Sequence, residues 1–169
     1  SSLKYLTELD LNLDEDLKMV DAEGNPTTVL PSGQFKGSAL EKVSLNGFTE
    51  IGASAFARSN DLETVVMSNV VTIGGSAFEE TSVEVVTLPE SIKSIGKNAF
   101  DQCEILNHIT IPSSVKTIGM EAFRWCFGLS DITIESGVSS IGYGAFDRCR
   151  SLSSITLPAS VTELGEKIF

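Results

Sequence analysis

Apolar residues recur along the chain with one long period, and a hexapeptide marks each period. In the copy Ile118-Gly119-Met120-Glu121-Ala122-Phe123, the first, fifth and last positions are apolar. The other copies begin at Leu30, Ile51, Ile73, Ile95, Ile141 and Leu164. Successive copies begin 21, 22, 22, 23, 23 and 23 residues apart. This period predicts a repeat solenoid, in which each repeat forms one coil and packs on its neighbours.

Two further groups of apolar residues lie between successive hexapeptides. Short segments such as Ile109-Thr110-Ile111 alternate apolar and polar residues, which is typical of a half-buried strand. The paired apolar residues are Val43 and Leu45, Val65 and Met67, Val86 and Leu88, Ile109 and Ile111, Ile132 and Ile134, and Ile155 and Leu157. Another apolar residue lies three positions before each later hexapeptide: Phe48, Val70, Ile92, Val115, Val138 and Val161. We therefore expect a roughly triangular coil, mostly of parallel β-strands with turns and short helical or 3-10 segments.

Two residue types are fixed in register with the hexapeptide. Seven of the nine Phe residues occupy its last position, at 35, 56, 78, 100, 123, 146 and 169. We expect them to stack through the interior. A Gly follows the leading residue in six copies, at 52, 74, 96, 119, 142 and 165. Glycine there supplies either unusual backbone angles or a close approach between coils.

Residues 1–29 depart from the repeat and predict an irregular N-terminal cap before a solenoid over residues 30–169. Lys18-Met19-Val20 and Thr27-Thr28-Val29 flank turn-forming residues, which predicts a hairpin insertion. The segment from Asp10 to Asp16 alternates oxygen-bearing side chains, but Glu15 holds the position where an EF-hand needs glycine. We interpret it as a solvated cap edge and expect no metal. The chain starts without Met and its last repeat is incomplete, so we interpret it as an excerpt of a longer protein.

Composition narrows the functional classes. The formal net charge is −11, which opposes nucleic-acid binding, and no apolar run reaches the length of a membrane span. Cys103, Cys126 and Cys149 lie 23 residues apart, in a column that holds small side chains in earlier coils. This spacing reflects the repeat period and does not indicate a disulfide framework. A coil spacing of about 4.8 Å leaves a bridge between neighbouring thiols geometrically open, but buried free thiols are the better interpretation.

The repeat resembles the BspA-type leucine-rich repeat. Residues 106–126 match that pattern at Leu106, Ile109, Ile111, Pro112, Val115, Ile118, Gly119, Ala122, Phe123 and Cys126. The resemblance covers residues 30–169, and residues 6–11 more weakly. It implies leucine-rich-repeat coils of 21–23 residues in a secreted or surface-displayed protein that adheres to extracellular-matrix, host or microbial proteins. It locates no site, because the matched residues belong to the core.

One candidate binding surface lies at a turn, where two aromatic residues replace polar ones. The column of Trp125 elsewhere holds Arg58, Glu80, Gln102 and Arg148, and that of Phe127 holds Asn60, Glu104 and Arg150. The same candidate includes Ile105, Arg124, Arg148 and Arg150, together with Met120 and Tyr143 from another normally exposed column. Exposed Trp, Tyr and Arg are typical of interaction hot spots. The alternative is that Trp125 and Phe127 fold over neighbouring turns and only shield the coil edge.

The outward positions of the strands form a second candidate face. They include Val66, Thr87, Thr110, Thr133 and Thr156, with His108 and Asp131 beside them. Regular sheet faces are common binding platforms in solenoids. Threonine is also what β propensity alone selects on a solvated strand, so a plain sheet surface is the simpler interpretation.

The sequence predicts no enzyme. His108 is the single histidine, no nucleophile has a base at a known spacing, and no glycine-rich loop could hold a phosphate. We expect no cofactor. The leading hypothesis is a secreted or cell-surface adhesion module that recognises a host or microbial protein, with no nucleic-acid partner and no membrane insertion. The alternatives are a passive spacer and a regulatory domain of a larger protein.

Overall fold

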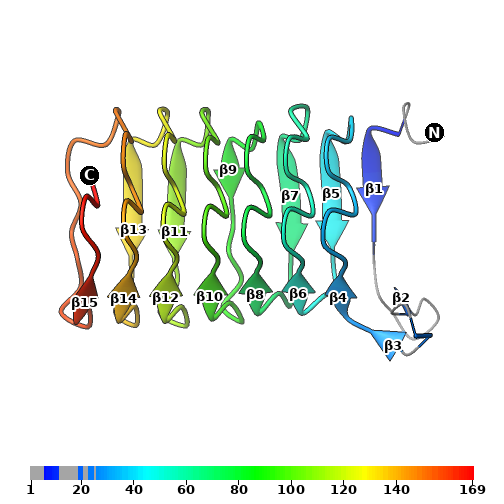
Figure 1. Cartoon of the computed structure of the whole chain (residues 1–169), viewed down its shortest axis with the longest axis horizontal. Coiled ribbons are helices and arrows are strands. Elements are labelled where there is room, and N and C mark those ends of the chain that lie inside the picture. The colour runs from blue at the N-terminus through cyan, green and yellow to red at the C-terminus, as the bar shows by residue number, and fades with distance from the viewer. Residues whose placement is uncertain (1–5, 12–18, 21–22, 25) are drawn as a thin grey trace.

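The computed structural model describes residues 6–11, 19–20, 23–24 and 26–169, and it is a parallel β-solenoid. Figure 1 shows the coils standing side by side along the long axis, with the N-terminal strand β1 at one end and β15 at the other. The predicted fold class, a repeat solenoid built mostly of β-strands and turns, is confirmed. The predicted division into an N-terminal cap of residues 1–29 and a solenoid of residues 30–169 stays a prediction.

One side of the coil is a seven-stranded parallel sheet in the order β15-β14-β12-β10-β8-β6-β4. Its strands are β4 (Val29–Leu30), β6 (Glu50–Ile51), β8 (Thr72–Ile73), β10 (Ser94–Ile95), β12 (Thr117–Ile118), β14 (Ser140–Ile141) and β15 (Glu163–Leu164). Each strand ends on the leading residue of a hexapeptide, so the register pairs Ile51 with Ile73 and Ile95 with Ile118. The repeat period therefore sets the strand register directly.

The second side carries five of the six predicted alternating segments as strands, in two sheets, and the segment of Ile155 and Leu157 forms none. One has the order β1-β5-β7, formed by β1 (Glu8–Asp10), β5 (Lys42–Leu45) and β7 (Thr64–Met67). The other has the order β13-β11-β9, formed by β9 (Val85–Val86), β11 (His108–Ile111) and β13 (Asp131–Ile134). In β7 and β13, inward residues are buried and outward ones exposed, as period-2 alternation predicts. β2 (Met19–Val20) pairs antiparallel with β3 (Pro26–Thr27).

Turns, and not the expected short helical or 3-10 segments, form the third side; no described residue is helical. Two residues of each turn have positive φ, which breaks any helical run. In the coil of Phe123 they are Glu121 (φ 55°) and Trp125 (φ 61°), and in the first coil they are Gly33 and Gly37. Backbone bonds join successive turns, as where the Phe78 amide donates to the Ala99 carbonyl at 2.8 Å.

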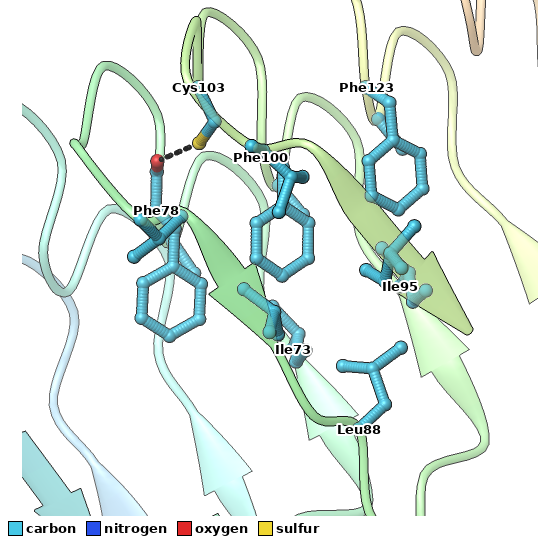
Figure 2. Close-up of a cluster of buried hydrophobic side chains, with 14 of the residues drawn as sticks. Ile73, Phe78, Leu88, Ile95, Phe100, Cys103 and Phe123 are labelled. Atoms are coloured by element: carbon cyan, nitrogen blue, oxygen red, sulfur yellow. Dashed lines mark hydrogen bonds between the residues drawn. The ribbon is translucent and has the colours of Figure 1, made fainter. Parts of the chain in front are cut away.

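The hexapeptide phenylalanines stack through the interior, as predicted. The centroids of neighbouring rings from Phe35 to Phe146 are 5.3 to 5.6 Å apart. The angle between the ring planes of Phe56 and Phe78 is 0°. Figure 2 shows Phe78, Phe100 and Phe123 in this row beside Ile73 and Ile95. Offset stacks of this kind add to the area that the rings bury, so the column is the main apolar support of the solenoid.

The glycine after the leading residue serves close approach between coils. A Cβ built on Gly96 would lie 2.7 Å from the carbonyl carbon of Gly74 and 2.8 Å from the amide nitrogen of Gly75. Side chains cannot approach backbone atoms so closely. Of the two reasons that the sequence left open, the structure therefore favours contact over unusual backbone angles.

The cysteine column supplies hydrogen-bond donors to the previous coil. Cys103, Cys126 and Cys149 are buried free thiols. The Cys103 thiol donates to the Phe78 carbonyl at 3.1 Å, as Figure 2 shows, and Ser59 donates in the same way to Phe35 at 2.8 Å. Cys126 and Cys149 donate likewise to Phe100 and Phe123, whereas Thr81 donates to Phe78 of its own coil. Ser, Thr and Cys thus share this column as small donors to a phenylalanine carbonyl.

Candidate partner-binding surface

The turn that carries Trp125 holds it in the left-handed backbone region. The same column has Gly37 in the first coil and Arg58, Glu80, Gln102 and Arg148 elsewhere, all with positive φ. A bulky residue in this region costs about 1–2 kcal/mol relative to glycine. Inter-coil bonds hold the turn nevertheless, because the Trp125 amide donates to the Asp147 carbonyl at 2.9 Å. The indole is thus displayed at a backbone position that the coil would fill more easily with glycine.

Trp125 and Phe127 form a stacked pair on this turn. Their ring centroids are 6.0 Å apart, with 29° between the planes. Phe127 is half-buried, and Trp125 remains 37% exposed. The suggestion that the two rings merely fold down over the edge therefore accounts for part of their surface only.

Two arginines of the next coil lie over these rings. The Arg148 guanidinium carbon is 5.5 Å from the centroid of Trp125, and that of Arg150 is 4.8 Å from the centroid of Phe127. Cation–π contacts of this kind contribute about 0.5–1 kcal/mol each at an exposed site. Both arginines stay exposed, although Nε of Arg148 also lies 3.8 Å from a carboxylate oxygen of Asp147. The two turns together therefore present aromatic faces bordered by guanidinium groups. We call Trp125, Phe127, Arg148 and Arg150 the aromatic edge.

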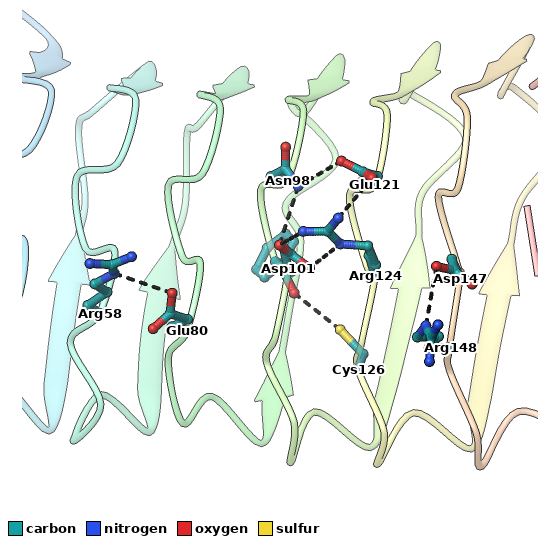
Figure 3. Close-up of polar contacts among 10 residues, drawn as sticks. Arg58, Glu80, Asn98, Asp101, Glu121, Arg124, Cys126, Asp147 and Arg148 are labelled. Carbon is teal, nitrogen blue, oxygen red and sulfur yellow. Dashed lines mark hydrogen bonds and ion pairs between the residues drawn. The ribbon is translucent and has the colours of Figure 1, made fainter.

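Arg124 is half-buried and binds two carboxylates of the solenoid. It donates from Nε and Nη2 to the two carboxylate oxygens of Asp101, at 3.0 and 2.7 Å, and from Nη1 to Glu121 at 2.9 Å. Asp101 is fully buried, and this pairing raises the pKa of Arg124 further above its usual value. Figure 3 shows the guanidinium between Asp101 and Glu121, with Asn98 completing the cluster. Arg124 therefore joins two coils, and its charge is balanced within the chain.

The other residues of the first candidate lie at separate points of the turn side. Ile105 is at the tip of the preceding turn and is 50% exposed. Tyr143 is 39% exposed, and Lys167 lies over its ring at 5.9 Å. Met120 is half-buried one coil before Tyr143, in the third position of its hexapeptide. The structure thus joins Trp125, Phe127, Arg148 and Arg150 by direct ring contacts and leaves Tyr143 paired with Lys167.

The strand face is a shallow, mixed surface. Val66 and Val85 are exposed, as are Thr87, Thr133 and Thr156, whereas Thr110 is half-buried. His108 lies opposite Asp131 on the neighbouring strand, with Nδ1 2.9 Å from its Oδ2. Cross-strand polar pairs of this kind are ordinary features of a solvated sheet. The face offers one polar pair and scattered valines.

The titratable groups offer little chemistry. Burial raises the pKa of the Cys103 and Cys149 thiols to about 12, and that of Cys126 well above its usual range, so the thiols are neutral and unreactive at physiological pH. Among the described residues, no three His, Cys, Asp or Glu side chains gather as a metal site would require. The oxygen-rich segment from Asp10 to Asp16 lies mostly outside the described residues. No described residue belongs to a helix that could cross a membrane.

Sequence reasoning missed two features of this surface. The first is the left-handed backbone at Trp125, for which Gly37 in the same column was the available signal. The second is the arginine cover, because aligned columns place Arg148 beside Trp125 and Arg150 beside Phe127 on successive coils. The first would have followed from comparing the residues of one column along the axis, whereas the second depends on which way the arginine side chains turn.

Three solved structures share this fold. A leucine-rich repeat protein of T. pallidum has 28% identity and a TM-score of 0.82, over 94% of this chain and 73% of that one. A leucine-rich cell surface protein of Faecalibacterium prausnitzii has 26% identity and a TM-score of 0.77, over 96% of this chain and 44% of that one. A Bacteroides ovatus leucine-rich repeat protein has 23% identity and a TM-score of 0.62, over 93% and 48%. The chain thus spans less than half the length of the last two.

The sequence itself assigns the family. Among curated proteins, none matches the chain. The family model described as "BspA type Leucine rich repeat region" matches in six copies, over residues 14–105 and 47–169. These ranges include the hexapeptides, the phenylalanine stack and the glycine contacts described above. The chain therefore belongs to the BspA-type leucine-rich repeat family.

Proposed function

We propose that this chain is a non-catalytic protein-binding module that is secreted or displayed at the cell surface and adheres to a host or microbial protein through its aromatic edge. The F. prausnitzii protein that it resembles is described as a cell surface protein. Leucine-rich repeats are generally interaction modules without catalysis, and the neutral thiols and the absence of ligand clusters among the described residues fit that role.

The observation that carries the proposal is the exposed, arginine-bordered aromatic pair. Trp and Arg are enriched where binding energy concentrates in protein interfaces. Trp125 and Phe127 stand where other coils have polar residues, and the stack of coils does not need them there. The rings also hold Arg148 and Arg150 in place, which lowers the entropy lost when a partner's carboxylate or carbonyl binds them.

The test replaces the rings without disturbing the coils. Trp125→Gly suits the left-handed backbone, and Phe127→Ser restores a polar turn residue, so we expect the double variant to fold. Binding of the wild-type chain and this variant to a panel of extracellular-matrix proteins and microbial surface proteins is measured by biolayer interferometry. We expect at least a tenfold loss of affinity, equivalent to about 1.4 kcal/mol.

The control is the double variant Thr133→Ser and Thr156→Ser on the strand face, which should bind as the wild type does. If the aromatic-edge variant binds with the affinity of the wild type, the contact lies on another surface. No binding to any member of the panel would favour a passive spacer or a regulatory domain.

A further inference from the structure

One coil has a shorter turn than the coils on either side of it. From the hexapeptide Phe to the first inward strand residue there are eight positions in the coil of Phe78 (to Val86), but nine in the coils of Phe56 and Phe100. Ser82 alone lies between the buried residues Thr81 and Val83, where the next coil has both Glu104 and Ile105 between Cys103 and Leu106. The Ser82 hydroxyl donates to the Asn60 carbonyl, which draws the short tip toward the preceding coil.

A hollow lies beside this short turn. Two adjoining cavities of about 290 and 400 Å³ share Ser82 and Ile105 in their linings. The first is lined by Asn60, Glu80, Thr81, Ser82, Gln102, Glu104 and Ile105. The second is lined by Glu63, Thr64, Ser82, Glu84, Val85 and Ile105. We call this pair of cavities the short-turn groove.

The apolar part of the groove lies at a seam in the sheet. β7 belongs to one three-stranded sheet and β9 to the other, so the ladder of paired strands is interrupted here. Val85 of β9 is 52% exposed and Ile105 is 50% exposed. These two side chains lie in the lining of one cavity and offer it an aliphatic wall.

The charged part of the groove is purely acidic. Glu63, Glu80, Glu84 and Glu104 line it, and no lysine or arginine does. Glu80 is bound to Arg58 at 3.3 Å, and Glu84 accepts a bond from Asn107 at 3.1 Å. Within the described part of the chain, the side chains of Glu63 and Glu104 have no ion pair. Two carboxylates are thus available to a cation.

The carboxylates of the groove are too far apart to hold a metal ion, which favours an organic cation. The described residues contain no group of three acidic or other ligand side chains close enough to hold a metal ion. A lysine or arginine side chain joins a cationic head to an aliphatic stem that packs on apolar surface. An aliphatic wall beside two free carboxylates is complementary to that combination.

We propose that the short-turn groove binds a lysine or arginine side chain of a protein partner, whose stem packs on Ile105 and Val85 and whose charged end pairs with Glu63 in the same cavity, while Glu104 adds negative charge from the adjoining one. This assignment rests on the proposed protein-binding function, but it uses different residues. The groove is on coils that precede those of the aromatic edge, so it adds a requirement for a basic residue beside the segment that contacts Trp125.

A selection of random twelve-residue peptides displayed on phage, against the immobilised full chain, tests the groove. We expect the enriched peptides to carry Lys or Arg next to an aliphatic residue. Affinities of the corresponding synthetic peptides are then measured for the wild type and for Glu63→Gln/Glu104→Gln. We expect a loss of about tenfold in the variant and a weakening of wild-type binding with added salt.

Two further variants separate the possible outcomes. Glu163→Gln/Glu166→Gln removes the same charge from the C-terminal coil and should leave peptide affinity unchanged. Trp125→Gly/Phe127→Ser tests the aromatic edge: if it loses the protein partner but retains the basic peptides, the two sites act separately. The groove assignment is overturned if no peptide is selected, if the selected peptides lack basic residues, or if Glu63→Gln/Glu104→Gln binds them like the wild type.

Discussion

At the scale of single residues, each column of the repeat meets one physical demand of stacked coils. Phenylalanine fills the interior, glycine allows two backbones to touch, and a small donor satisfies the carbonyl of the preceding phenylalanine. Every column repeats one environment along the axis. A residue of a different chemical type in a column must therefore either find a bonding partner nearby or remain exposed to solvent. Arg124 and Asp101 find partners in each other, whereas Trp125 remains exposed.

The glycine column yields a stability prediction. Gly96→Ala should lower the free energy of unfolding by at least about 1–3 kcal/mol, because its Cβ would lie 2.7 Å from the backbone of Gly74 and force the coils apart. Gly75→Ala is the matched control, since its nearest contact would be the Lys97 carbonyl at an ordinary 3.4 Å. Urea unfolding of both variants measures the difference. Equal midpoints would contradict close packing at this corner.

The thiol column yields a pH prediction. Burial raises the pKa of Cys103 and Cys149 from 9.0 to about 12, so the unfolded chain loses these protons at lower pH than the folded chain. Stability from the neutral thiols is complete below pH 9 and is lost between pH 9 and 12. Each thiol then lowers the free energy of unfolding by roughly 1.4 kcal/mol per pH unit.

Melting temperatures at pH 8 and pH 10.5 check this prediction. The triple variant Cys103→Ser/Cys126→Ser/Cys149→Ser keeps the donors, as Ser59 does, but has no thiol to ionise. The wild type should lose more stability than the variant on going to the higher pH. Equal losses would show that the thiols are not buried.

At the scale of elements, the sequence predicted strands better than turns. The strands Asp131–Ile134 and His108–Ile111 could be predicted because alternation reports directly which side chains face inward. The turns were wrongly given short helical segments, because only Gly33, Gly37 and Gly144 mark the positive-φ columns with glycine, and most coils have other residues there. The break between β7 and β9 could not be predicted from polarity either, since the alternation of Val65 and Met67 continues in Val86 and Leu88 across it.

The candidate site was predictable only in part. The columns singled out Trp125 and Phe127 because their neighbours are polar. They did not reveal that Arg124 turns to buried Asp101 while Arg148 and Arg150 lie on the rings, since the sequence pattern does not say which partner a long side chain reaches.

The ion pair between adjacent turns gives an element-scale prediction. Arg124→Met should destabilise the chain by about 3–5 kcal/mol, because Asp101 would remain fully buried without its partner. Arg58→Met breaks the exposed pair with Glu80 and should cost about 0–1 kcal/mol. Figure 3 shows both pairs on the same side of the solenoid, so they are matched in setting. Guanidinium unfolding distinguishes them, and comparable costs would argue against a buried charge at Asp101.

At the scale of the whole molecule, the residues that hold the coils together are different from those exposed on the turns. The phenylalanine stack and the seven-stranded sheet hold successive coils in register, while turn tips differ from coil to coil and carry the exposed apolar and charged residues. The net charge of −11 gives the molecule a general attraction for basic partners, and the arginines of the aromatic edge form a local exception. A partner is therefore expected to contact the turn side of the later coils.

The most direct test of that claim is amide hydrogen exchange of the full chain, alone and saturated with the protein partner identified from the panel. We predict slower exchange on binding in residues 121–129 and 143–151, with the strand residues 108–111 and 131–134 unchanged. Protection confined to those strands, or spread evenly along the chain, would contradict binding at the aromatic edge.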